Sequence, residues 1–216
     1  MPESTTLELR EQFANPEQQL ETAKIGMWIF LVTEIMLFGG LFMAFTVYRM
    51  YYPQAFDVGS RGMSIVLGSV NTAVLICSSL AMAMADHSAE NGNQRMLALF
   101  LILTMILGAV FLGIKFTEYY EHFQEHKVPG IWFEYSGSNP GQVQMFYVFY
   151  FLMTGLHAIH MTIGLCVLGF MLLRTIFGTF TAKYFTPIQL SGLYWHFVDI
   201  IWVFLYALFY LPGLHK

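Results

Sequence analysis

Five long apolar runs decide what this chain can fold into. They cover residues 25–48, 63–85, 96–117, 145–173 and 190–211. At 1.5 Å of rise per residue, a helix of about 20 residues crosses the roughly 30 Å hydrocarbon core of a bilayer. A transmembrane β-strand would show alternation over about ten residues, whereas these runs are continuous and twice as long. The sequence therefore predicts an all-α, polytopic membrane protein, built as a bundle of five transmembrane helices.

The segments outside the runs are short and polar. Only 11% of the residues are charged, against about 25% in soluble domains. Residues 1–24 lack the basic end and short apolar core of a secretory signal, so we expect a solvated, partly helical tail there and a second tail at 212–216. The Lys and Arg residues, Lys115 among them, divide evenly between the two sides of the predicted bundle, so the positive-inside rule gives no orientation.

Two charged residues stand out in the runs. Glu34 lies near the middle of the first run among Leu, Ile, Met and Phe, where loss of water disfavours a charged carboxylate. It fits either a proton relay or ion site, or a structural group that hydrogen-bonds across the bundle or lines a lipid cleft. Arg174 ends the fourth run, and its planar guanidinium matches a lipid phosphate.

The last two runs carry histidines. His157 and His160 are three residues apart, which places them on one helix face, and His196 precedes Asp199 by the same spacing. Haem or metal ligation requires three or four convergent ligands of fixed geometry. Interhelical hydrogen bonding or contact with lipid head groups is the favoured alternative.

A set of ionisable residues follows the third run at spacings of three and four: Glu118, Glu121, His122, Glu125 and His126. A metal site is one hypothesis. The favoured interpretation is a solvated helix end at the membrane surface, with Tyr119 and Tyr120 in the aromatic belt. The chain has no P-loop, no CxxC and no pair of Gly- or Pro-broken helices of the transporter kind, so we expect no catalytic site in it.

Several segments, in order along residues 24–211, resemble subunit III of the haem–copper respiratory oxidases, in the short form without the first two helices of the seven-helix version. The two strongest are Thr154-Gly-Leu-His-Ala-Ile-His160 and Tyr194-Trp-His-Phe-Val-Asp-Ile-Ile-Trp202. The others are Lys24-Ile-Gly-Met, Thr33-Glu34-Ile-Met-Leu-Phe, Asn71-Thr72, Ser78-Ser79, Leu107-Gly108 and Glu118-Tyr119-Tyr120-Glu121.

The resemblance implies a non-catalytic subunit of a proton-pumping terminal oxidase in the aerobic respiratory chain. Glu34 falls on the membrane carboxylate that reacts with hydrophobic carbodiimides in the family. Arg174 matches an arginine that contacts a phospholipid phosphate in a lipid-lined, V-shaped cleft. His157, His160, His196 and Asp199 join these two as lipid-binding or proton-related candidates. By the same resemblance, the subunit holds bound phospholipid and supports proton uptake and stability during turnover.

Partners and location follow from the same resemblance. The chain is expected to pack mainly on subunit I, with subunit II and further respiratory subunits nearby, and to bind no nucleic acid. Haems and copper are expected in subunits I and II and no cofactor in this chain; ferrocytochrome c or quinol delivers electrons to those partners. The expected location is a bacterial inner membrane with a cytoplasmic N-terminus. Lys115 departs from the family, which often has Gln there.

Two alternatives remain open at this point. One is the related accessory subunit of a nitric oxide reductase, which shares the fold. The other is a stand-alone proton-coupled transporter that uses Glu34, His160 and Asp199 as its relay.

Overall fold

The fold is a bundle of long helices. The computed structural model describes residues 15–130, 133–135, 137, 139–178, 180 and 184–214. Its elements are α1 (Pro16–Tyr51), α2 (Pro53–Arg61), α3 (Ile65–Glu90), α4 (Gln94–Gln124), α5 (Pro140–Ile176), α6 (Thr186–Phe209) and the 3-10 helix η1 (Leu211–Leu214). Among the described residues, five helices are long and apolar enough to cross a membrane: α1, α3, α4, α5 and α6. The predicted all-α polytopic bundle is confirmed.

The helices extend beyond the apolar runs. Helix α1 begins at Pro16, where Asn15 caps it by accepting a hydrogen bond from the Gln18 backbone N–H at 2.8 Å; a side-chain oxygen at this position satisfies a free helix-end donor. Helix α2, between the first two spans, was not predicted. Residues 1–14 of the expected N-terminal tail and 215–216 of the C-terminal tail lie outside the described residues.

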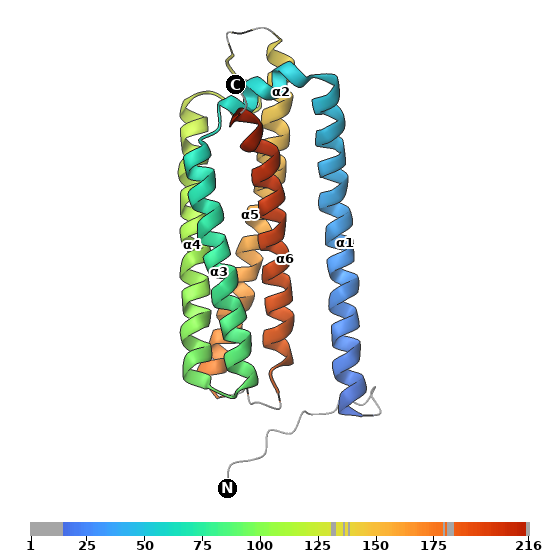
Figure 1. Ribbon diagram of the computed structural model, residues 1–216, viewed down its shortest axis with the longest axis vertical. Coiled ribbons are helices and arrows are strands. Elements are labelled where there is room, and N and C mark those ends of the chain that lie inside the picture. The colour runs from blue at the N-terminus through green and yellow to red at the C-terminus, as the bar shows by residue number, and fades with distance from the viewer. Residues whose placement is uncertain are drawn as a thin grey trace.

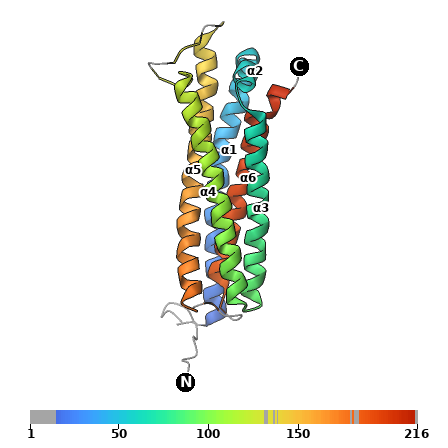
Figure 2. The ribbon, with the colours of Figure 1, turned by 90° about the vertical axis from the view of Figure 1, so that its left-hand side faces the viewer.

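The spanning helices are unequally packed. Helices α3 to α6 form a compact group, and α1 stands to one side of it (Figure 1). Helix α1 packs on α6, α5 and α2. The short helix α2 lies across the end of the bundle beside η1 (Figures 1 and 2). Because the number of spanning helices in the described chain is odd, the start of α1 and η1 lie at opposite ends of the molecule.

An aromatic cluster attaches α1 and α2 to the end of the bundle at which α2 lies. Phe45 of α1 packs edge-on against Phe56 of α2, Phe149 of α5 and Phe209 of α6, with ring centroids 5.2, 5.9 and 4.9 Å apart. Edge-to-face pairs at this separation are favourable beyond simple burial. The Ser60 hydroxyl also donates to the Phe209 carbonyl at 2.7 Å. Helix α2 therefore closes the bundle at the end where α1 arrives.

Two glycines make room for a tryptophan at the centre of the four-helix group formed by α3 to α6. Trp195 of α6 is fully buried, and its indole N–H donates to the Ser78 hydroxyl at 3.1 Å. A β-carbon built at Gly108 of α4 would lie 2.8 Å from the Trp195 ring, and one at Gly164 of α5 would lie 2.9 Å from it. Small residues let helices approach closely in membranes, and here two of them make room for one indole.

We predict that Gly108→Ala destabilises the protein by about 1–3 kcal/mol, because the added methyl overpacks a rigid, buried ring. The measurement is the free energy of unfolding in mixed micelles titrated with denaturing detergent. Gly113→Ala, on the same helix, is the matched control, since in the described chain a β-carbon there would have nothing within 4 Å apart from its chain neighbours and the adjacent backbone of its own helix. Equal stability of the two variants would contradict the proposed fit around Trp195.

Candidate functional site

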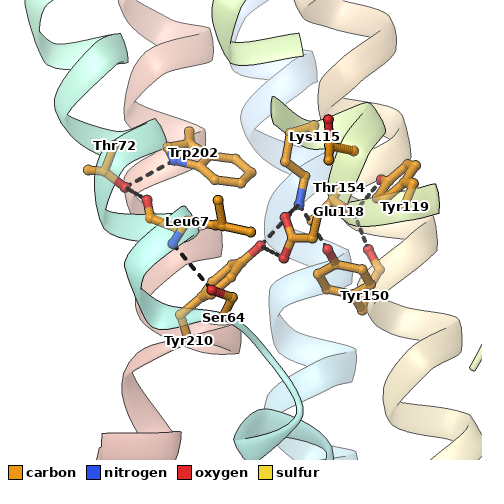
Figure 3. Close-up of polar contacts among 12 residues, drawn as sticks. Ser64, Leu67, Thr72, Lys115, Glu118, Tyr119, Tyr150, Thr154, Trp202 and Tyr210 are labelled. Atoms are coloured by element: carbon orange, nitrogen blue, oxygen red, sulfur yellow. Dashed lines mark hydrogen bonds and ion pairs between the residues drawn. The ribbon is translucent and has the colours of Figure 1, made fainter. Parts of the chain in front are cut away.

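A buried ion pair lies where α4, α5 and the end of α6 meet (Figure 3). Lys115 and Glu118 of α4 are 3% and 2% exposed, and the Lys115 Nζ lies 2.8 Å from a Glu118 oxygen. A charge in hydrocarbon costs several kcal/mol unless a partner neutralises it. The i,i+3 spacing on one helix supplies that partner locally.

Tyrosines from other helices complete the coordination of this pair. The Lys115 Nζ donates to the hydroxyls of Tyr150 on α5, at 2.9 Å, and Tyr210 at the end of α6, at 3.0 Å. The Tyr210 hydroxyl in turn donates to the second Glu118 oxygen at 2.6 Å. The Lys115 ammonium also lies 5.1 Å from the Trp202 ring centroid, within the range of a cation–π contact. Three helices are thus joined through one lysine.

The interfacial interpretation of the end of α4 was wrong for part of its residues. Glu118 and His122 are buried, at 2% and 5% exposure, whereas Glu121 and Glu125 are exposed. Lys115 is likewise not a flanking charge but an interior one. The reason is that α4 continues to Gln124 and packs this face against α5. The signal available in the sequence was a Lys three residues before a Glu inside an apolar run.

A second ionisable pair joins α1 to the four-helix group. A Glu34 carboxylate oxygen lies 2.9 Å from Nε2 of His160 on α5, and their side chains are 16% and 11% exposed. His160 Nδ1 is 2.8 Å from the Leu156 carbonyl, which defines it as the donor there. The Tyr194 hydroxyl of α6 donates to the His160 carbonyl at 2.9 Å. Two of the predicted site residues, from segments far apart in sequence, are therefore neighbours.

His157 faces a different set of neighbours from His160. It is 1% exposed and packs between Phe111 of α4 and Trp202 of α6, with centroid distances of 5.4 and 5.3 Å. Neither ring nitrogen has a hydrogen-bond partner among the described residues. The structure therefore does not bring His157 and His160 into one binding site.

His196 and Asp199 line a third location, on the α3 side of α6. His196 Nδ1 is 2.7 Å from the Ser79 hydroxyl of α3, and Asp199 is 6% exposed. Both border a groove of about 480 Å³ between the two helices. Within the described chain, no hydrogen bond connects this pair with Glu34 and His160, so the transporter relay of Glu34, His160 and Asp199 is not assembled.

Two apolar grooves flank α1. One, of about 520 Å³, lies between α1 and α6 and includes Trp28, Ile35 and Phe204. The other, of about 360 Å³, is bordered by α1, α5 and the start of α6, and includes Val167 and Met171.

Arg174 lies one helical turn beyond Met171. Its guanidinium carbon is 5.5 Å from the Phe180 ring centroid and 6.0 Å from that of Phe170. No carboxylate pairs with it in the part of the chain that the structure describes. A partly buried cation thus lies one helical turn from a residue that borders an apolar groove.

These polar groups lie in separate places between helices and not around one reaction centre. Over the described ranges, no group of three or more His, Cys, Asp or Glu side chains converges in a way that could hold a metal ion. What the geometry can do is join helices, hold a proton on Glu34 or His160, and offer a cation beside an apolar groove.

Comparison with known proteins gives a consistent result. A family model described as cytochrome c oxidase subunit III matches residues 16–214. Quinol oxidase subunit 3 of Bacillus subtilis (strain 168) is 30% identical over 207 residues, covering 92% of each chain. Cytochrome c oxidase subunit 3 of Thermostichus vulcanus is 30% identical over 189 residues, covering 87% of this chain and 86% of the relative. The protein of the same name in Papio hamadryas is 30% identical, covering 89% of this chain and 70% of the relative.

For the buried ion pair, we predict that Lys115→Met lowers the free energy of unfolding by about 3–5 kcal/mol, because Glu118 is left as an uncompensated buried charge. The double variant Lys115→Met with Glu118→Gln should recover part of this loss, since it removes both charges. Detergent-induced unfolding followed by helix content measures each value.

The matched control for this experiment is Lys127→Met. Lys127 pairs with Glu125 at 2.6 Å, but the two side chains are 30% and 54% exposed, so its loss should cost less than about 1 kcal/mol. If Lys115→Met were as mild as this control, the ion pair would not hold the three helices together.

Proposed function

This chain belongs to the cytochrome c oxidase subunit III family, which supplies a subunit of haem–copper oxidases, and we propose that it serves its complex by holding lipid beside α1 and stabilising the catalytic subunit. The single observation that carries the proposal is the pair of apolar grooves on either side of α1, with Arg174 one helical turn beyond Met171, which borders one of them. The chain itself contributes no catalytic site to oxygen reduction.

The grooves suit lipid acyl chains. The groove between α1 and α6 is lined almost wholly by apolar side chains, and a lipid tail gains by contact with such a surface. Arg174 lies one helical turn beyond Met171, which borders the groove between α1, α5 and α6, and two residues before α5 ends at Ile176. We expect a lipid head group at this level, near the end of the helix. A guanidinium binds phosphate in a bidentate fashion. We take the predicted lipid-lined cleft to be these two grooves.

Glu34 and His160 have a proposed role at the edge of this region. Their contact supports attachment of α1 to α5 half-way along α1, and one of the two groups can hold a proton. His157 and His196 are proposed as neighbouring structural groups: His157 packs α5 against α4 and α6, and His196 joins α6 to α3.

Membership in the family places the chain in a complex with other oxidase subunits, and its five spanning helices make it a multi-pass membrane protein. We further propose that subunit I is its main contact, with subunit II and additional respiratory subunits nearby, and that haems and copper reside in subunits I and II. The proposed location is a bacterial inner membrane with a cytoplasmic N-terminus. The relatives are named as oxidase subunits, so neither the nitric oxide reductase nor the transporter alternative is favoured.

The experiment that tests the function is a gentle detergent purification of the tagged chain from native membranes. We expect a coloured preparation that contains a haem-bearing subunit. We also expect oxidase depleted of this chain to consume oxygen at first and then to inactivate sooner. A colourless, partner-free chain would contradict the assignment, as would a complete loss of initial activity on depletion.

For Glu34, we predict that both Glu34→Ala and Glu34→Gln leave the haem content of the complex unchanged, because the haems are proposed to reside in other subunits. Glu34→Gln should also keep the lifetime during turnover, since an amide still hydrogen-bonds His160, whereas Glu34→Ala should shorten it. Progress curves of oxygen consumption measure this lifetime. Equal shortening in both variants would show that the proton, and not the attachment, matters; loss of haem would contradict both roles.

For Arg174, we predict that Arg174→Ala lowers the amount of phospholipid retained by the purified complex, because the cation proposed to bind the head-group phosphate is lost. Lipid mass spectrometry of the complex provides the measurement. Arg95→Ala is the control, as Arg95 is an exposed arginine in the first turn of α4. Unchanged lipid in the Arg174 variant would refute the proposed head-group contact.

A further inference from the structure

The groove between α3 and α6 differs from those beside α1 because a buried carboxylate, that of Asp199, borders it. Its apolar rim includes Ile76 and Leu80 of α3 and Ile200 of α6, whose side chains are 59%, 65% and 55% exposed. Asp199 and His196 lie between these walls. An apolar face with a buried polar centre is unusual on a surface that only meets lipid, because hydrocarbon offers no hydrogen bonds.

The Asp199 carboxylate is the unsatisfied group in this groove. Asp199 is 6% exposed, and neither of its oxygens accepts a hydrogen bond from any described residue. The Ser79 hydroxyl interacts with this carboxylate, but its well-formed hydrogen bond is with His196 Nδ1, at 2.7 Å. A buried polar group without a partner is costly. The chain alone therefore leaves a hydrogen-bonding position open on its surface.

The depth of Asp199 restricts what can occupy that position. It lies 13 residues after Thr186, where α6 begins, and 10 residues before Phe209, where α6 ends. At 1.5 Å per residue these spacings correspond to about 20 and 15 Å. A lipid head group does not descend so far, and an acyl chain has no donor to offer. A side chain of another membrane protein can reach this depth and can also donate a hydrogen bond.

We propose that the α3–α6 groove is the docking face for a transmembrane helix of another oxidase subunit, which places a hydrogen-bond-donating side chain against Asp199. The exposed rim residues Ile76, Leu80 and Ile200 pack on the apolar part of that helix. The proposal rests on the assignment of the chain to an oxidase complex and adds which face of the chain meets its partner, and through which polar contact.

Photochemical cross-linking in the intact oxidase, in native membranes, tests the face. A benzophenone amino acid is introduced at Ile200, at the groove, or at Ile106 of α4, a control of matched exposure (55% and 54%) on a helix that does not line the groove. We expect a cross-link from Ile200 to another oxidase subunit, identified by mass spectrometry, and lipid adducts from Ile106. Lipid adducts alone at Ile200, a cross-link to a second copy of this chain, or equal protein cross-linking at both positions would overturn the proposal.

A pair of substitutions tests the polar contact. Asp199→Asn keeps a carbonyl oxygen that accepts a hydrogen bond, whereas Asp199→Leu does not. We expect Asp199→Leu to weaken retention of the cross-linked partner by roughly tenfold, a loss typical of leaving a buried donor unpaired, and Asp199→Asn to retain it. Retention by both variants would overturn the role of Asp199. The cross-linking experiment keeps Asp199 intact, so it decides the docking face even where a variant fails to insert.

Failure of this inference differs in its signature from failure of the proposed function. A coloured complex in which Ile200 reaches only lipid would refute the docking face and leave the oxidase assignment standing. A colourless chain would refute the assignment itself.

Discussion

The packing of the helices in this protein depends on one ammonium group, that of Lys115. Lys115 reaches Glu118 on its own helix, Tyr150 on α5 and Tyr210 after α6, so the charge that would be hardest to bury is also the point where three helices meet. In a membrane the hydrophobic effect does not press helices together, and packing and polar contacts have to specify the arrangement. A buried charge with partners on several helices favours the arrangement of those helices in which all the partners reach it. The aromatic cluster of Phe45 and the closing helix α2 lie at this same end of the bundle.

Much of the architecture was available from the sequence, because hydropathy alone locates helices that cross a bilayer. The five spans and the helical class needed no tertiary information. The burial of Lys115 and Glu118 did, since a Lys and a Glu with tyrosines at the end of an apolar run also describe an ordinary membrane-surface segment. Their partners Tyr150 and Tyr210 lie 35 and 95 residues from Lys115. Helix α2 was missed because it lies between the apolar runs from which the helices were predicted, although its buried residues Ala55, Phe56, Gly59 and Ser60 recur at helical spacing.

The candidate site residues were predictable one by one but not as pairs. Glu34, His160, His196 and Asp199 each stood out as a polar group within an apolar run. Their spacing along a helix does not reveal which neighbouring helix each one faces. In the structure His160 contacts Glu34 of α1, whereas His196 contacts Ser79 of α3. His157 and His160 show the same effect, because three residues of helix rotation direct one ring toward Phe111 and the other toward Glu34. Side-chain direction relative to other helices is set by packing, which a single sequence does not encode locally.

The contact between Glu34 and His160 has a consequence for how the chain is made. The two residues are 126 positions apart, and at about 5–20 residues per second a ribosome needs roughly 6–25 s to synthesise that interval. During this time α1 is already available for insertion while α5 does not yet exist. An ionised side chain at the centre of a span costs about 3 kcal/mol on insertion scales, a cost that the rest of the apolar run on α1 has to outweigh unaided. Helix α1 therefore has to be hydrophobic enough to remain in the membrane before its partner helix is made. The contact between Glu34 and His160 forms only after α5 has been synthesised.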